Sequence, residues 1–104
     1  LLESRLPESN VPIKFELHKP FPNPFNPKTK IAFNTTNDAK IELVIFDING
    51  RLVKEFDMSG ISPGYHVFEW DASDSYGDQV STGVYFIRSA NEASYQVQKI
   101  VFLK

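Results

Sequence analysis

The chain of 104 residues has no cysteine, which excludes disulfide bonds, thiolate zinc sites and a cysteine nucleophile. It also has no apolar run near the roughly 20 residues that a membrane-spanning helix needs. The longest apolar runs are 43–46 and 100–103. The 11 lysines and arginines are scattered and the net charge is -2, so no basic face for nucleic acid is expected.

The chain opens Leu-Leu-Glu-Ser-Arg, without an initiator methionine or a signal peptide. We therefore expect a fragment from the C-terminal end of a longer protein. Residues 1–12, LLESRLPESNVP, are polar and contain two prolines, which is typical of a linker. Residues 13–104 have the size and composition of one globular domain.

From residue 13 onward the pattern is that of β-strands, with turn residues every eight to twelve positions and no convincing helix. The expected strands are 13–17, 29–35, 40–48, 51–56, 65–70, 83–89 and 93–103. About seven short antiparallel strands predict an all-β, immunoglobulin-like sandwich of two sheets.

Three positions within this pattern carry specific expectations. Asn49-Gly50 lies between two apolar runs and predicts a hairpin, because both residues accept positive φ. Trp70 is the expected central core residue. Tyr85 follows Gly83 at the start of its strand and could bond back to the preceding loop as a tyrosine corner.

The heptad FPNPFNP is the least foldable stretch in the chain, because each proline fixes its own φ and restricts the residue before it. It predicts a stiff extended segment in which Asn23 and Asn26 bond to nearby backbone amides. We expect Phe21 and Phe25 to plug one end of the β core. The alternative is an exposed proline-rich ligand for another domain.

Few residues are candidates for metal binding or catalysis. Asp71, Asp74 and Asp78 form a weak calcium candidate in a polar loop, but their spacing does not match an EF-hand. We expect Asp71 and Asp74 to accept backbone hydrogen bonds in a wide turn instead. His18 and His66 have no triad partners at a recognisable spacing. No catalytic residues, metal or cofactor are therefore predicted.

Four stretches occur in an order and spacing that resemble a known family. They are FPNPFNPKTKIAF, IELVIFDINGRLVKEF, SPGYHVFEWDASDSYGDQVSTGVYFIR and QKIVFLK. Together they look like the C-terminal sorting domain carried by cargo of the type IX secretion system. They are also similar to the related immunoglobulin-like domain of flagellar hook-capping proteins. The family-motif positions are Phe21, Pro22, Asn23, Pro24, Phe25, Asn26, Pro27, Asn49, Gly50, Trp70, Asp71, Gly83 and Tyr85.

The resemblance implies a non-catalytic domain at the C-terminus of a larger exported protein of Bacteroidetes type. The cargo precedes it, passes through the periplasm, and ends at the cell surface or outside the cell. An outer-membrane translocon recognises the domain, and a sortase cleaves in the linker before it. The implied recognition residues are Lys99, Ile100, Val101, Phe102, Leu103 and Lys104.

The residues themselves suggest how such recognition could work. If the last strand lies at a sheet edge, its unpaired backbone could accept a receptor strand, with Lys99 and Lys104 supplying charge. The alternative is that 100–103 are only core residues of a closing strand. We expect a monomer. The other functions considered are a carbohydrate-binding or adhesion module of a secreted hydrolase and a self-associating hook-cap assembly domain.

Overall fold

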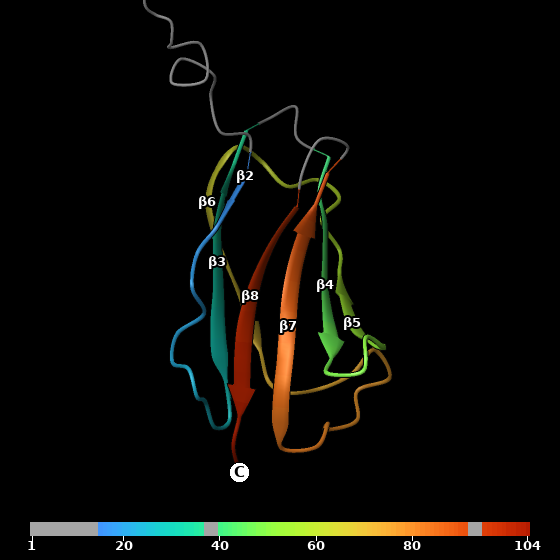
Figure 1. Ribbon diagram of the computed structural model, residues 1–104. Helices are drawn as coiled ribbons and strands as arrows, with labels where there is room; N and C mark the ends of the chain where they lie inside the picture. The colour runs from blue at the N-terminus through green and yellow to red at the C-terminus, as the bar shows by residue number, and fades with distance from the viewer. Residues whose placement is uncertain (1–14, 37–39, 92–94) are drawn as a thin grey trace, which may run out of the picture.

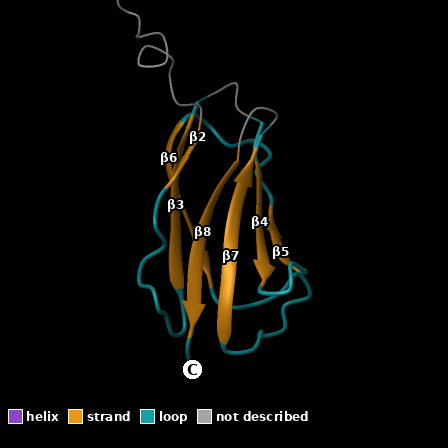
Figure 2. Cartoon of the chain, viewed as in Figure 1, coloured by secondary structure: helices purple, strands orange, loops and turns teal. Residues whose placement is uncertain are grey.

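The computed structural model describes residues 15–36, 40–91 and 95–104. That part of the chain is all β, with seven strands in two antiparallel sheets and no helix (Figures 1 and 2). No helix in the described residues is long and apolar enough to cross a membrane. The expected linker, 1–12, lies outside them.

One sheet has three strands and the other has four. The three-stranded sheet has the order β2 (Phe15–Leu17), β3 (Thr29–Thr35) and β6 (Gly64–Trp70). The four-stranded sheet has the order β5 (Leu52–Phe56), β4 (Glu42–Asp47), β7 (Gly83–Ala90) and β8 (Tyr95–Phe102). The predicted immunoglobulin-like sandwich is confirmed. Its first strand is described only from Phe15.

The core lies between the sheets and follows the alternation in the sequence. In β3, Ile31 and Phe33 are fully buried, while Lys30 and Ala32, which alternate with them, face outward. In β4, Leu43, Val44 and Ile45 are all buried, which fits the expectation of a central strand covered on both faces. Trp70 is 0% exposed, so its predicted place in the core is confirmed.

Candidate functional site

The last strand, β8, lies at the edge of the four-stranded sheet, where it pairs with β7 alone. Its side chains alternate between core and solvent. Ile100 and Phe102 are both 0% exposed, so they are core residues. Lys99, Leu103 and Lys104 are exposed and Val101 is half-buried. Of the six residues expected to be recognised, only the outward-facing ones offer a partner their side chains.

The outer edge of β8 is not free along its C-terminal half. The Asn23 side-chain amide donates to Lys99 O at 2.8 Å, and its Oδ1 accepts from Val101 N at 2.8 Å. Phe25 N donates to Val101 O at 2.9 Å, and Leu103 N donates to Phe25 O at 3.1 Å. The proline-rich heptad therefore covers this edge, and we call the segment 21–27 the clasp.

The clasp corrects two expectations. Asn23 does not bond to nearby amides as a turn residue does. Its side chain instead donates to and accepts from the backbone of β8, near the other end of the chain. The unpaired edge expected for the end of the last strand is already paired, so a receptor strand could not add there without displacing the clasp. The peptide bonds before Pro22, Pro24 and Pro27 are cis.

Only one of the two clasp phenylalanines plugs the core. Phe25 is 2% exposed, and its ring lies 5.5 Å from Trp70 and 5.1 Å from Phe102. Phe21 is 77% exposed, so the expectation that it also seals the sandwich is wrong. The backbone of Phe21 instead pairs with Lys30 of β3. The clasp therefore directs Phe25 into the core and Phe21 toward solvent.

Gln96, near the start of β8, joins the two sheets on the same side of the sandwich. Its Oε1 accepts from Leu17 N at 2.9 Å, and its Nε2 donates to Phe15 O at 2.6 Å. One side-chain amide on β8 thus satisfies the outer edge of β2 and joins the two sheets. Sequence reasoning missed this role, because an isolated glutamine in a strand carries no local signal of a partner about 80 residues away.

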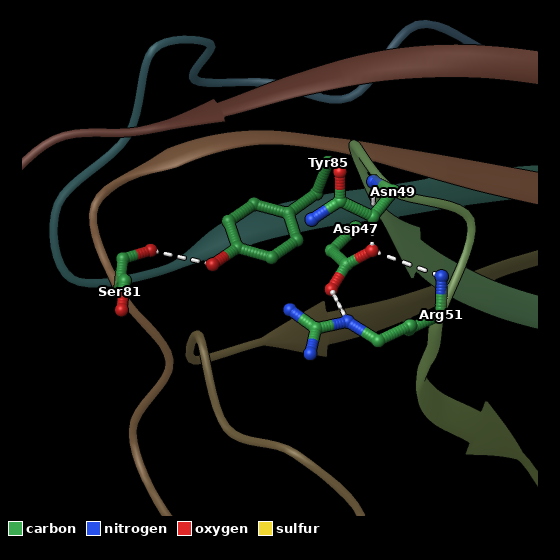
Figure 3. Close-up of polar contacts among 5 residues, drawn as sticks. All are labelled: Asp47, Asn49, Arg51, Ser81 and Tyr85. Atoms are coloured by element: carbon green, nitrogen blue, oxygen red, sulfur yellow. Dashed lines mark hydrogen bonds and ion pairs between the residues drawn. The ribbon is translucent and has the colours of Figure 1, made fainter.

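A tyrosine corner stabilises the end of the sandwich at which β4 ends and β7 begins (Figure 3). Tyr85 is nearly buried, and its hydroxyl donates to Ser81 O at 2.5 Å, as the sequence predicted. Burial, and secondarily the carboxylate of Asp47, raise the pKa of Tyr85 above its usual value. This bond ties the loop before β7 to the strand itself.

The neighbouring hairpin joins β4 to β5, as Asn49-Gly50 predicted, but its turn differs from the expected one. Gly50 has a φ of +82°, whereas Asn49 stays at negative φ. Asp47 organises the turn instead. Its carboxylate accepts from Arg51 N, Asn49 N and Arg51 Nε, each at 2.9 Å (Figure 3). The bond from the Arg51 backbone is the largest cause that holds the pKa of Asp47 below its ordinary value.

The aspartate loop forms a hydrogen-bonded turn. Asp74 Oδ1 accepts from the backbone N–H of Tyr76 and of Asp78, at 2.9 and 3.0 Å. Asp71 accepts from the hydroxyl of Ser73, which is the largest cause of its lowered pKa. Among the described residues no three acidic or histidine side chains lie close enough together to hold a metal ion.

Both histidine side chains form a hydrogen bond within the protein. His18 Nε2 donates to Asn34 Oδ1 at 2.5 Å, and His66 Nε2 donates to Ser62 O at 2.7 Å. His18 also borders a groove of about 330 Å³ on the outer face of the three-stranded sheet. The rest of its lining is Lys19, Phe21, Lys30, Ala32, Tyr65 and Val67.

These elements define an immunoglobulin-like β-sandwich whose last strand is held at a sheet edge by a proline-rich segment. A family model, the FlgD Ig-like domain, matches residues 23–94. The chain belongs to that family.

One solved structure, that of dimeric latent PorU from Porphyromonas gingivalis, resembles the chain with a TM-score of 0.65 and 20% sequence identity. The match covers 86% of this chain and 9% of PorU, so this chain spans only a small part of that protein's length. The likeness supports the fold. The comparison with curated proteins found no match.

Proposed function

We propose that this is a non-catalytic C-terminal sorting domain, which directs a larger exported protein through the type IX outer-membrane translocon. The cargo precedes the domain, a sortase removes it in the linker, and the product reaches the cell surface or the medium. The family assignment supports the immunoglobulin-like class. The order of the four sequence stretches supports the specific sorting role.

The observation that carries the proposal is the presentation of the chain's end. Ile100 and Phe102 anchor the last strand in the core, while the clasp holds its edge. Lys99, Leu103 and Lys104 are thereby exposed at the end of a fixed strand. Lys99 lies beside Phe86 on the outer face of the sheet, so a receptor meets positive charge next to an aromatic surface.

A secretion assay tests the proposal. Residues 1–104 are fused after a fluorescent protein that is exported to the periplasm of a bacterium with a type IX system. One variant combines K99E, L103S and K104E, which changes exposed side chains and leaves the core intact. A matched control combines K19E and K30E, which lie outside the four-stranded sheet and form no ion pair with any described carboxylate.

We expect the parent fusion and the control to reach the surface or the medium, and the triple variant to stay in the periplasm. All three must show the same melting temperature. Export of the triple variant would contradict recognition through these residues. Retention of the parent fusion would count against the sorting function in that host.

A second function, a carbohydrate-binding module, is favoured by the groove that contains Tyr65. Tyr65 is 63% exposed and Phe21 is 77% exposed, and exposed aromatic rings with nearby polar groups suit stacking on sugar rings. A glycan array with the parent chain and Tyr65→Ala tests it, with the exposed Tyr76→Ala as the control. Binding lost only in the Tyr65 variant would favour this function.

A further inference from the structure

The edges of the two sheets are protected unequally. Gln96 covers β2, and the clasp covers β8 from Lys99 to Leu103. On β5, Val53 O accepts from Ser75 N at 3.0 Å, and the pairing of β4 with β5 is broken by a bulge. These are the devices by which folded proteins keep sheet edges from pairing with other chains.

The fourth edge, that of β6, has none of these devices. Its pairing with β3 runs from Gly64 to Trp70 without a register shift. No backbone group on its other side forms a hydrogen bond with any residue that the structure describes. Its sequence, GYHVFEW, contains neither lysine nor proline. An edge of seven residues extends over roughly 24 Å, which is long enough to pair with a whole strand.

The hydrogen bonds of β3 identify which groups of β6 are free. Lys30 and Ala32 direct their backbone groups away from β6, because Lys30 pairs with Phe21 and Ala32 O accepts from His18 N. The intervening residues of β3 therefore face β6, and they lie opposite its even-numbered residues. In an antiparallel pair this leaves the N–H and C=O groups of the odd residues of β6 pointing outward. These residues are Tyr65, Val67 and Glu69.

Apolar side chains line the seam between this edge and β5. The rings of Phe56 and Phe68 stack at 5.5 Å across it. Both are only partly buried, as are Met58 and Ile61 nearby. A strand laid along β6 would direct every second side chain toward this seam and remove apolar surface from water.

We propose that the edge of β6 binds an extended segment of a partner protein by antiparallel strand addition. The segment places apolar side chains toward Phe56 and Phe68. It also places a lysine or arginine opposite Glu69, whose carboxylate otherwise forms an exposed ion pair with Lys28 at 3.8 Å. This inference does not depend on the sorting function, and it places strand addition on β6 instead of β8. Because β6 contains no lysine or arginine, a second copy that paired through its own β6 could not place a basic side chain opposite Glu69.

A synthetic peptide, KTKIAFNTT, is a suitable probe, because the same sequence at 28–36 already pairs with the opposite side of β6. In the same register its second lysine lies opposite Glu69, and its isoleucine and phenylalanine face the seam. Its alanine N–H then points at β6, whereas its phenylalanine N–H points away. Methylation of one or the other nitrogen gives a matched pair of peptides.

The test is an NMR titration of the 104-residue chain with millimolar peptide. We expect the amide resonances of Tyr65, Val67 and Glu69 to shift and their hydrogen exchange to slow. Methylation at alanine should weaken binding at least about tenfold, and methylation at phenylalanine should change it little. In the protein, Val67→Pro removes an outward N–H without breaking a bond to β3, and it should weaken binding equally, whereas Val67→Thr should bind normally.

Several results would overturn the proposal. The first is no amide shift with millimolar peptide. The second is equal binding of the two methylated peptides. The third is a set of shifts spread along β3, as strand exchange would give. If the free chain sediments as a dimer with Tyr65, Val67 and Glu69 already protected from exchange, the occupant is a second copy. If Val67→Pro melts at a lower temperature than the parent, the pair of methylated peptides decides the outcome.

Discussion

At the scale of single residues, Asp47 and Tyr85 lie opposite one another at the same end of the sheet. Asp47 organises the turn after β4, and Tyr85 ties down the loop before β7. Both act through hydrogen bonds to backbone groups only two to four residues away. Such local bonds can be tested by single substitutions.

The hydroxyl of Tyr85 should contribute measurably to stability. Tyr85→Phe removes its bond to Ser81 and leaves the ring in place, so we expect a loss of about 1 kcal/mol in the free energy of unfolding. Urea denaturation measures this loss. Tyr76→Phe is the control, because Tyr76 is 91% exposed. Equal stability of both variants would show that the corner bond contributes nothing.

Asp47 should make stability depend on pH. Its pKa is lowered in the folded state, so its contribution is complete above its unfolded pKa and is lost as pH falls through the folded pKa. Asp47→Asn should therefore melt at a lower temperature than the parent at neutral pH. The difference should shrink below about pH 4.

Melting curves over this pH range check the dependence, with Asp78→Asn as the control. The side chain of Asp78 accepts no hydrogen bond from any described residue. A constant difference at every pH would mean that the charge of Asp47 does not act in the folded state.

At the scale of elements, the clasp is the feature that distinguishes this sandwich. It has little regular structure of its own, yet it completes the edge of β8 and adds Phe25 to the core. A proline-rich segment suits this position, because its missing N–H groups cannot pair with another chain. Its rigidity also lowers the entropy lost on docking.

The side-chain amide of Asn23 should contribute more to the free energy of unfolding than that of Asn26. Asn23→Ala breaks both bonds to the edge of β8, and we expect a loss of about 1–2 kcal/mol. The amide of Val101 should also exchange faster with solvent. Asn26→Ala is the matched control, since Asn26 is exposed and its side chain bonds to no described residue. Equal effects of both would contradict a specific role for Asn23.

The two phenylalanines of the clasp should contribute very differently to the free energy of unfolding. Phe25→Ala removes a buried ring and should lower the free energy of unfolding by about 3–5 kcal/mol. Phe21→Ala removes an exposed ring and should change it by less than about 0.5 kcal/mol. Denaturant titration of both variants measures the contrast. Comparable losses would mean that Phe21 also packs into the core.

At the scale of the whole molecule, the end of the chain has a structural role as well as the proposed recognition role. A chain that stops at Gln98 lacks Ile100 and Phe102, which are both fully buried. It also lacks the backbone that Asn23 and Phe25 bond to. The proposed recognition and the folding role therefore fall on the same six residues, and deletion cannot separate them.

We expect the chain that stops at Gln98 to have no cooperative unfolding transition. Removing two buried side chains should remove most of the roughly 5–15 kcal/mol by which a domain is stable. Circular dichroism during heating checks this, with the K99E, L103S and K104E variant as a folded control. A sharp transition in the truncated chain would show that the last strand is dispensable for folding.

Much of the fold could be predicted from the sequence. The alternation of apolar residues predicted the strands to within a few residues, because side-chain period is a local property of a strand. Trp70 in the core, the hairpin at Asn49-Gly50 and the corner at Tyr85 were also predicted. The turn conformation was not, because it depends on the Asp47 carboxylate and not on the two turn residues alone.

The sequence by itself determined the strands, the class of fold and which residues of 99–104 could carry charge. Only the tertiary structure decided which sheet edges are covered and which of those residues face solvent. The bonds that decide this join Asn23 to Lys99 and Val101, and Gln96 to Phe15 and Leu17. Each spans more than 70 residues, so no local pattern records it, and it forms only when the two sheets have packed.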